Sequence, residues 1–168
     1  MTDQPLAAAF GTRPSQSFAT ARNDWLNAFA RLELEIGRCI HRVSETSEER
    51  GRPLAQRLKT LAATKASPRC SKAETSRLPD LCAASEQLLS LRASLVHSIM
   101  VEGRRENEPV AFFQNVSEAL AQTTLYHVFS NEDFERTRKE VTTLAATFAR
   151  FPRACAPPRP KPGAAAGP

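Results

Sequence analysis

Apolar side chains on one narrow face of residues 17–43 constrain the fold most strongly. At about 100° per residue, they stay within one arc for roughly seven helical turns. The members of this arc are Phe18, Trp25, Phe29, Leu32, Ile36, Cys39, Ile40 and Val43. Such a periodicity predicts a long amphipathic helix whose apolar face must be covered by other elements.

A second predicted helix, Leu78–Ile99, is the element around which the rest of the chain is organised. Pro79 near its start is favourable, because its missing N–H is not needed in the first helical turn. Two apolar stripes follow this helix, formed by Leu81, Ala84, Leu88, Leu91 and Leu95 and by Cys82, Leu89 and Val96. We therefore expect it to be the central helix of a bundle.

The remaining segments predict shorter elements. Pro53 suits the first position of a short helix, which the polar stretch 67–76 ends. The segments 99–103 and 109–115 bracket the polar turn RRENE and predict a β-hairpin or an extended excursion. Residues 117–129 suit a helix in their first half and a strand in their second half.

A capping box predicts the start of the last helix. Ser130 and Asp133 have the spacing of this motif, and the helix would run to Phe151, before Pro152. The prediction for the whole chain is a mainly α fold, a bundle of about four helices with a small β-hairpin or extended excursion after the third. We expect a disordered lead at 1–15, one domain at 16–151 and a disordered, Pro-rich basic tail at 152–168.

Charge and hydropathy limit the classes of partner. The chain of 168 residues has a formal charge of +5, and three cations of the tail leave about +2 for the rest. That value is too weak to indicate nucleic-acid binding by electrostatics alone. No apolar run approaches the ~20 residues of a membrane span, and the N-terminus lacks the pattern of a secretory signal. We expect a soluble, cytoplasmic protein without a membrane partner.

The same survey gives no prediction of a metal or cofactor. The four cysteines, at 39, 70, 82 and 155, form no CxxC pair, and the three histidines have no ligand-like spacing. We expect reduced, mostly structural thiols. The sequence contains no Gly-rich phosphate loop and no G-x-S-x-G motif.

Arg92 is the residue that most needs explanation. Together with Ser85 and Ile99 it lies between the two apolar stripes, where a guanidinium is costly unless it is paired. It requires a carboxylate, a phosphate or a subunit boundary, unless its stem carries the charge out to water. Glu33 and Glu35 flank the apolar arc of the first helix and are candidate partners, although both also suit solvated helix edges.

The string Arg92-x4-His97 matches the R-x4-6-H motif of the HEPN superfamily. These helical domains include ribonuclease toxins, defence proteins and non-catalytic RNA-binding modules. The segment LRASLVHS also resembles the R-N-x-x-V-H-G pattern common in that superfamily. This chain departs from the pattern at Ala93, where active members usually have a polar residue, and at Ser98, where glycine is frequent.

The resemblance implies roles for several residues. In an active member His97 would exchange a proton and Arg92 would clamp the scissile phosphate, in a metal-independent cleavage shared by two subunits. Ser94 or Ser98 would add a hydrogen bond to the phosphate. On an ideal helix His97 lies about 140° from Arg92, so the two meet only if the helix loosens or two copies pair.

Three functional hypotheses remain open, and we favour the first. The chain is a HEPN-like homodimer that binds RNA or a partner protein without cutting, an active metal-independent endoribonuclease of toxin or defence type, or a structural helical adaptor. Arg104 and Arg105 near Phe112 and Phe113 combine cations and aromatic rings as an RNA platform does. Burial in the core is the alternative for both phenylalanines.

Overall fold

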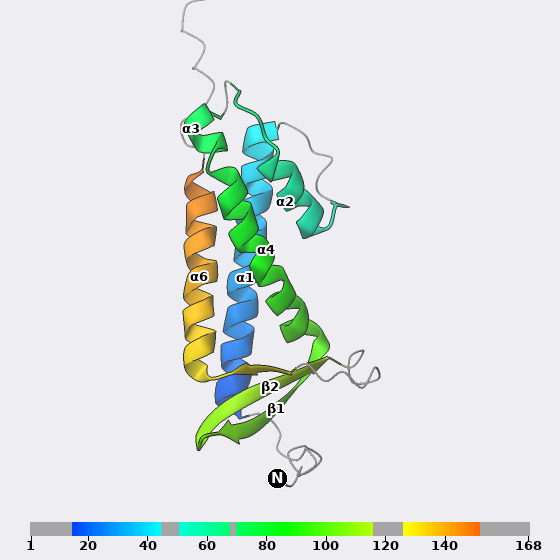
Figure 1. The fold of residues 1–168 in the computed structure, drawn as a ribbon, viewed down its shortest axis with the longest axis vertical. Coiled ribbons are helices and arrows are strands. Elements are labelled where there is room, and N and C mark those ends of the chain that lie inside the picture. The colour runs from blue at the N-terminus through cyan, green and yellow to red at the C-terminus, as the bar shows by residue number, and fades with distance from the viewer. Residues whose placement is uncertain (1–14, 45–50, 68–69, 116–125, 152–168) are drawn as a thin grey trace, which may run out of the picture.

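The first and last long helices lie side by side and run in the same direction (Figure 1). The computed structural model describes residues 15–44, 51–67, 70–115 and 126–151. Its elements, in chain order, are α1 (Gln16–Ser44), α2 (Leu54–Ala62), α3 (Lys72–Thr75), α4 (Leu78–His97), β1 (Ser98–Arg105), β2 (Glu108–Asn115), β3 (Tyr126–Phe129) and α6 (Asn131–Arg150). The predicted mainly α bundle with a small β excursion after its central helix is confirmed.

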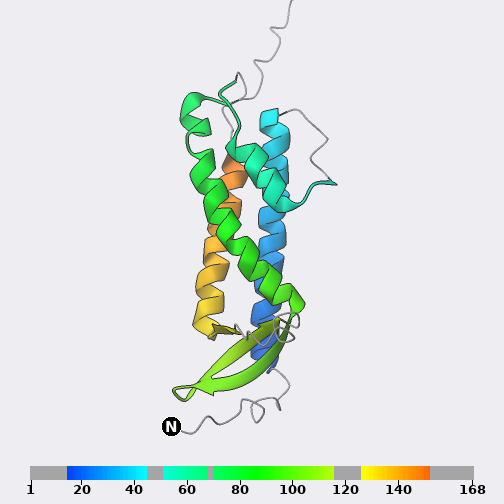
Figure 2. The same cartoon turned by 45° about the vertical axis from the view of Figure 1, so that its right-hand side comes forward.

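Side-chain hydrogen bonds establish the parallel packing of α1 and α6. The indole N–H of Trp25 donates to the hydroxyl of Thr137 at 3.0 Å. Further along both helices, Arg42 Nη2 donates to the carbonyl of Phe148 at 2.7 Å. Contacts therefore follow the same order in both helices, while α4 runs in the opposite direction beside them (Figure 2).

A three-stranded antiparallel sheet closes one end of the bundle. Its order is β1-β2-β3, and the turn between β1 and β2 places Glu106 and Asn107 at φ values of 51° and 70°. Two successive residues with positive φ are typical of a two-residue type I′ hairpin turn. The predicted hairpin is thus confirmed, with strands that extend to the turn on both sides.

Aromatic rings join the sheet to the helices. Phe113 of β2 lies edge-on to Phe134 of α6, with ring centroids 5.9 Å apart, and Phe134 also contacts Phe18 of α1. All three side chains are almost completely buried. Burying a phenylalanine contributes about 2 kcal/mol, so this contact anchors the sheet firmly to the base of the bundle.

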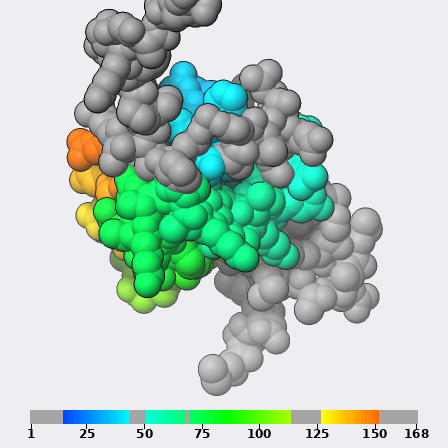
Figure 3. Space-filling view, turned by 90° about the horizontal axis from the view of Figure 1, so that it is seen from above, coloured from blue at the N-terminus to red at the C-terminus, as the bar shows by residue number. Residues whose placement is uncertain are grey.

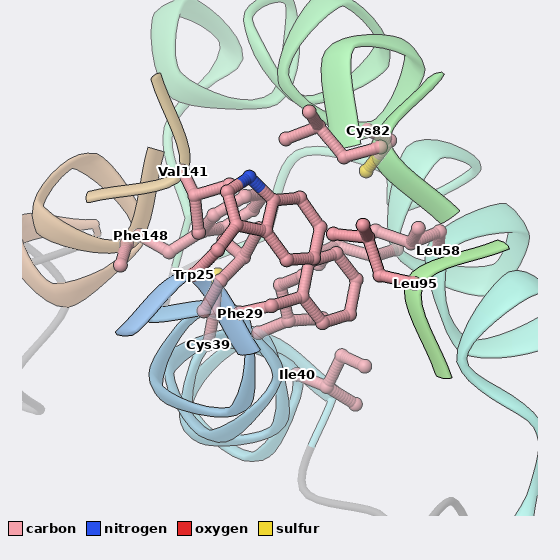
Figure 4. Packing of buried hydrophobic residues seen from close by; sticks show 14 of the residues in the cluster. Trp25, Phe29, Cys39, Ile40, Leu58, Cys82, Leu95, Val141 and Phe148 are labelled. Carbon is pink, nitrogen blue, oxygen red and sulfur yellow. The ribbon is translucent and has the colours of Figure 1, made fainter. Parts of the chain in front are cut away.

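The apolar arc predicted for the first helix forms the core. Every member of the arc, from Phe18 to Val43, is buried. Figure 4 shows Trp25 and Phe29 stacked among side chains of α2, α4 and α6. Burial raises the pKa of both the Cys39 and the Cys82 thiols to about 12, which makes them unreactive near neutral pH. Among the described residues Cys39, Cys70 and Cys82 are buried and form no disulfide, and Cys155 lies outside the described residues.

The short helix α2 packs against α4 and α1 near the end opposite the sheet (Figure 1), and its residues lie beside those of α4 when the molecule is seen from that end (Figure 3). The Arg57 side chain of α2 lies against α1 at Gly37. A Cβ atom added at Gly37 would lie only 2.7 Å from Arg57 Nη2. The absence of a side chain at Gly37 therefore lets the guanidinium lie against the helix. Pro53 is the residue that precedes α2 rather than its first member, a shift of one position from the prediction.

The central helix ends earlier than its apolar pattern indicates. Ser98 is extended, with φ −99° and ψ 150°, so α4 stops at His97 and Ile99 belongs to β1. Pairing with β2 explains the difference, because the β-branched residues Ile99 and Val101 favour a strand, although Ile99 also continues the apolar pattern of α4. The predicted lead and tail and residues 116–125 lie outside the described residues, apart from Ser15, while 126–129 form a strand.

The capping box of α6 predicts a specific pH dependence of stability. The Ser130 backbone N–H donates to Asp133 at 3.1 Å, and this bond, with the Ser130 hydroxyl and Arg136, lowers the pKa of Asp133. Because the folded pKa lies below the unfolded value of about 3.9, ionised Asp133 stabilises the fold at neutral pH. This contribution is lost as the pH falls below about 4 and through the folded pKa.

We therefore expect Asp133→Asn to lower the free energy of unfolding by about 1 kcal/mol at pH 7. The deficit relative to the parent chain should shrink as the pH approaches 2.5, measured by urea unfolding at each pH. Glu132→Gln removes an exposed charge in the same turn and serves as control. A deficit that stays constant with pH would contradict the assignment.

Candidate functional site

Arg92 lies on the buried face of α4, as the sequence predicts. Its neighbours one turn away on either side, Leu88 and Leu95, are buried, and Ser85 two turns earlier is buried as well. Arg92 itself is partly buried. Within the described part of the chain its guanidinium forms no hydrogen bond or ion pair.

A second guanidinium reaches the same region from α1. Arg22 Nε donates to the carbonyl of Leu95 at 2.8 Å, in a partly buried contact. Because α4 ends at His97, this carbonyl has no partner within its helix, and cations stabilise such C-terminal carbonyls. The contact places Arg22 at the end of α4, within one turn of Arg92.

Sequence reasoning missed Arg22, although a signal was present. On the helical wheel of α1, Arg22 lies about 40° from Phe18, at the same angle as the buried Ile40. A cation inside the apolar arc is the same anomaly that singled out Arg92. The two anomalies occur on helices that face each other.

Neither carboxylate proposed for Arg92 reaches it. Glu33 pairs with Arg57 of α2 at 3.7 Å, and Glu35 pairs with Arg38 at 2.6 Å. α1 and α4 run in opposite directions, and Arg22 is the residue of α1 that lies level with Leu95 of α4. This arrangement explains why neither carboxylate reaches Arg92. Glu33 lies eleven residues further along α1, about 16 Å away along the helix axis.

His97 is exposed and is the last residue of α4. The helix is continuous through both motif residues, so His97 points about 140° away from Arg92 and one chain does not bring them together. Ser94 donates its hydroxyl to the Ser90 carbonyl at 3.2 Å, whereas the Ser98 hydroxyl is buried without a hydrogen-bond partner.

The basic residues of the hairpin form a separate surface. Arg104 and Arg105 are exposed at the turn end of β1, about 20 Å along the strand from Ser98. Phe113 is in the core, whereas Phe112 is partly buried beside Gly103, where a Cβ would lie 2.7 Å from its ring. Of the two rings considered for an RNA platform on the hairpin, Phe113 is therefore part of the core, and only Phe112 is partly exposed.

Other features of the described residues do not extend the site. An open groove of about 980 Å³ separates α4 from α6, with Leu88 and Leu144 among its lining residues, and Arg92 and His97 lie outside it. The described residues contain no cluster of three or more side chains that could hold a metal ion. Among the described helices, none has the length and apolar character needed to cross a membrane.

Comparison of the chain with protein-family models, with curated proteins and with solved structures found no match.

The unpaired state of Arg92 predicts that it lowers stability. Arg92→Leu should raise the free energy of unfolding by about 1 kcal/mol, because an apolar side chain replaces a poorly solvated cation between two buried leucines. Urea unfolding at pH 7 measures this change. Arg31→Leu, at an exposed position of α1, should change stability by no more than about 0.5 kcal/mol. Destabilisation by Arg92→Leu would mean that the guanidinium has a partner.

Proposed function

We propose that this chain is a HEPN-like RNA-binding module in which Arg92 binds a backbone phosphate at the C-terminal half of α4. One observation carries the proposal: a partly buried guanidinium lies between buried leucines without an anionic partner in the described part of the chain. Such a charge is costly in an apolar setting and is relieved when an anion binds.

Phosphate suits Arg92 better than other anions. The planar guanidinium donates two parallel hydrogen bonds to phosphate oxygens, and its charge is permanent. A phosphodiester supplies the anion at every nucleotide, so binding needs no particular base. The resemblance of LRASLVHS to the HEPN pattern favours RNA as the source of the phosphate.

The proposed activity is binding without cleavage. A general acid or base must lie within hydrogen-bond reach of the reacting group, and His97 points away from Arg92 on a continuous helix. Ala93 and Ser98 also depart from the pattern of active members. His97 then contributes a polar contact at the edge of the site.

A homodimer is part of this proposal. The exposed large apolar side chains among the described residues are Leu34, Val96 and Ile99, and the last two flank His97. Burying Val96 and Ile99 against a second copy would remove the exposed apolar surface beside His97 and place two phosphate sites along one RNA strand.

RNA binding should depend on Arg92 and on salt. In EDTA, a fluorescently labelled single-stranded RNA should bind the parent chain, and Arg92→Ala should weaken binding at least about tenfold, because the guanidinium is the main phosphate contact. Fluorescence anisotropy at several salt concentrations measures affinity and its salt dependence. Arg77→Ala, at the opposite end of α4, should bind as the parent does.

Gel analysis of the same mixtures tests cleavage. Cutting that His97→Ala abolishes would identify an active ribonuclease and replace the proposed function. If the parent chain neither binds nor cuts RNA, the proposal is wrong and a helical adaptor is the better description.

Dimerisation should depend on Ile99, which is 59% exposed on β1. At tens of micromolar, light scattering should give twice the chain mass of 18.5 kDa. Ile99→Glu should give the monomer mass, because a charge would be buried at the contact. Leu34→Glu changes a side chain that is 52% exposed on α1 and should leave the dimer intact. A parent chain that is monomeric would remove the dimer from the proposal.

A further inference from the structure

Two arginines, Arg22 on α1 and Arg92 on α4, lie at neighbouring levels of these two helices. Arg22 Nε is 2.8 Å from the Leu95 carbonyl oxygen, and Arg92 is one turn earlier on α4. We propose that Arg22 is a second ligand of the phosphate, so that one phosphodiester is held between the two helices by Arg22 and Arg92. This inference rests on the proposed function and names a residue outside the Arg92-x4-His97 motif.

Helix geometry places the two residues at neighbouring levels of α1 and α4. Three residues along α4 correspond to a rise of about 4.5 Å, so Arg22 contacts α4 within one helical turn of the Arg92 Cα atom. On α1, Arg22 lies at the edge of the apolar arc that faces α4. Arg57 of α2 contacts Glu33 much further along α1, so α2 covers a different part of the seam (Figure 1).

The hydrogen bond to Leu95 leaves Arg22 able to bind an anion. That bond uses Nε, and within the described residues the two terminal nitrogens have no partner. A guanidinium carries five N–H donors, so it can stabilise a helix end through one edge and bind phosphate through the other. The end of α4 would then hold Arg22 in position before the ligand arrives.

The carboxylates of this region have other partners: Glu102 accepts from the Ser15 N–H before α1, about two helical turns from Arg22. Asp24, two residues from Arg22, lies among the residues of the grooves between α1 and α6, on the other side of α1. Glu33 and Glu35 are paired with other arginines. If the two guanidiniums converge, their charges repel each other, and a phosphate bound to both replaces this repulsion by attraction to a common partner.

The test compares Arg22→Gln with Arg31→Gln. Both remove one cation from α1, but Arg31 is exposed and lies along the groove with α6. We expect Arg22→Gln to weaken RNA binding at least about tenfold and Arg31→Gln to leave it within about twofold. Inorganic phosphate should raise the Tm of the parent and of Arg31→Gln, but not that of Arg22→Gln.

A double substitution separates phosphate binding from a merely structural role. If Arg22 and Arg92 hold the same phosphate, Arg22→Gln with Arg92→Gln should weaken RNA binding by less than the product of the two single effects. A purely structural role of Arg22 would lower Tm without removing the stabilisation by phosphate, and that result would overturn the inference.

Phenylglyoxal modification of the parent chain provides a measurement that does not depend on a folded variant. Mass spectrometry should show that bound RNA protects Arg22 and Arg92 but not Arg31. Equal modification of Arg22 with and without bound RNA would overturn the inference.

Two outcomes distinguish this inference from the proposed function. RNA binding that needs Arg92 but not Arg22 would overturn the inference and leave the function standing. Stabilisation by phosphate that needs both arginines, in a chain that does not bind RNA, would support the two-arginine site and overturn the RNA function. If neither RNA nor phosphate binds, both are wrong.

Discussion

The parallel packing of α1 and α6 is the constraint on which the rest of the structure depends. Neighbouring parallel helices cannot be joined by a short turn, so the chain must return along the bundle before the second of them starts. In this protein α4 makes that return and the sheet carries the chain across the base. The end of α4 consequently lies beside the first turns of α1, which is where Arg22 meets Leu95.

Charged and polar groups at the helix ends reinforce this arrangement. Arg22 and Arg42, both on α1, donate to the last carbonyls of α4 and α6, respectively. At the N-terminal ends of the helices the charges are negative. The Ser15 N–H before α1 donates to Glu102 at 2.7 Å, and Asp133 accepts from the Ser130 N–H at the start of α6. Cations therefore lie at C-terminal ends and carboxylates at N-terminal ends, as helix dipoles favour, and this offsets the unfavourable alignment of two parallel helices.

The fold was largely predictable from the sequence, whereas the site was predictable only in part. Local periodicity and capping rules are properties of neighbouring residues, so α1, the capping box at Ser130 and the hairpin could be predicted. The partners of Arg92 depend on which helices become neighbours and at which level. The wheel gave the correct face of Arg92, but the pairing of Glu33 with Arg57 and the approach of Arg22 depend on tertiary packing.

The position of Trp25 has a practical consequence. It is the single tryptophan of the chain, fully buried, and its indole N–H bonds to Thr137 across the contact between α1 and α6. Intrinsic fluorescence of this protein is therefore a built-in reporter of whether the first and last helices are docked. Its emission should be blue-shifted in the native state and move to longer wavelength when that contact opens, which makes the separation of these two helices visible without any added dye.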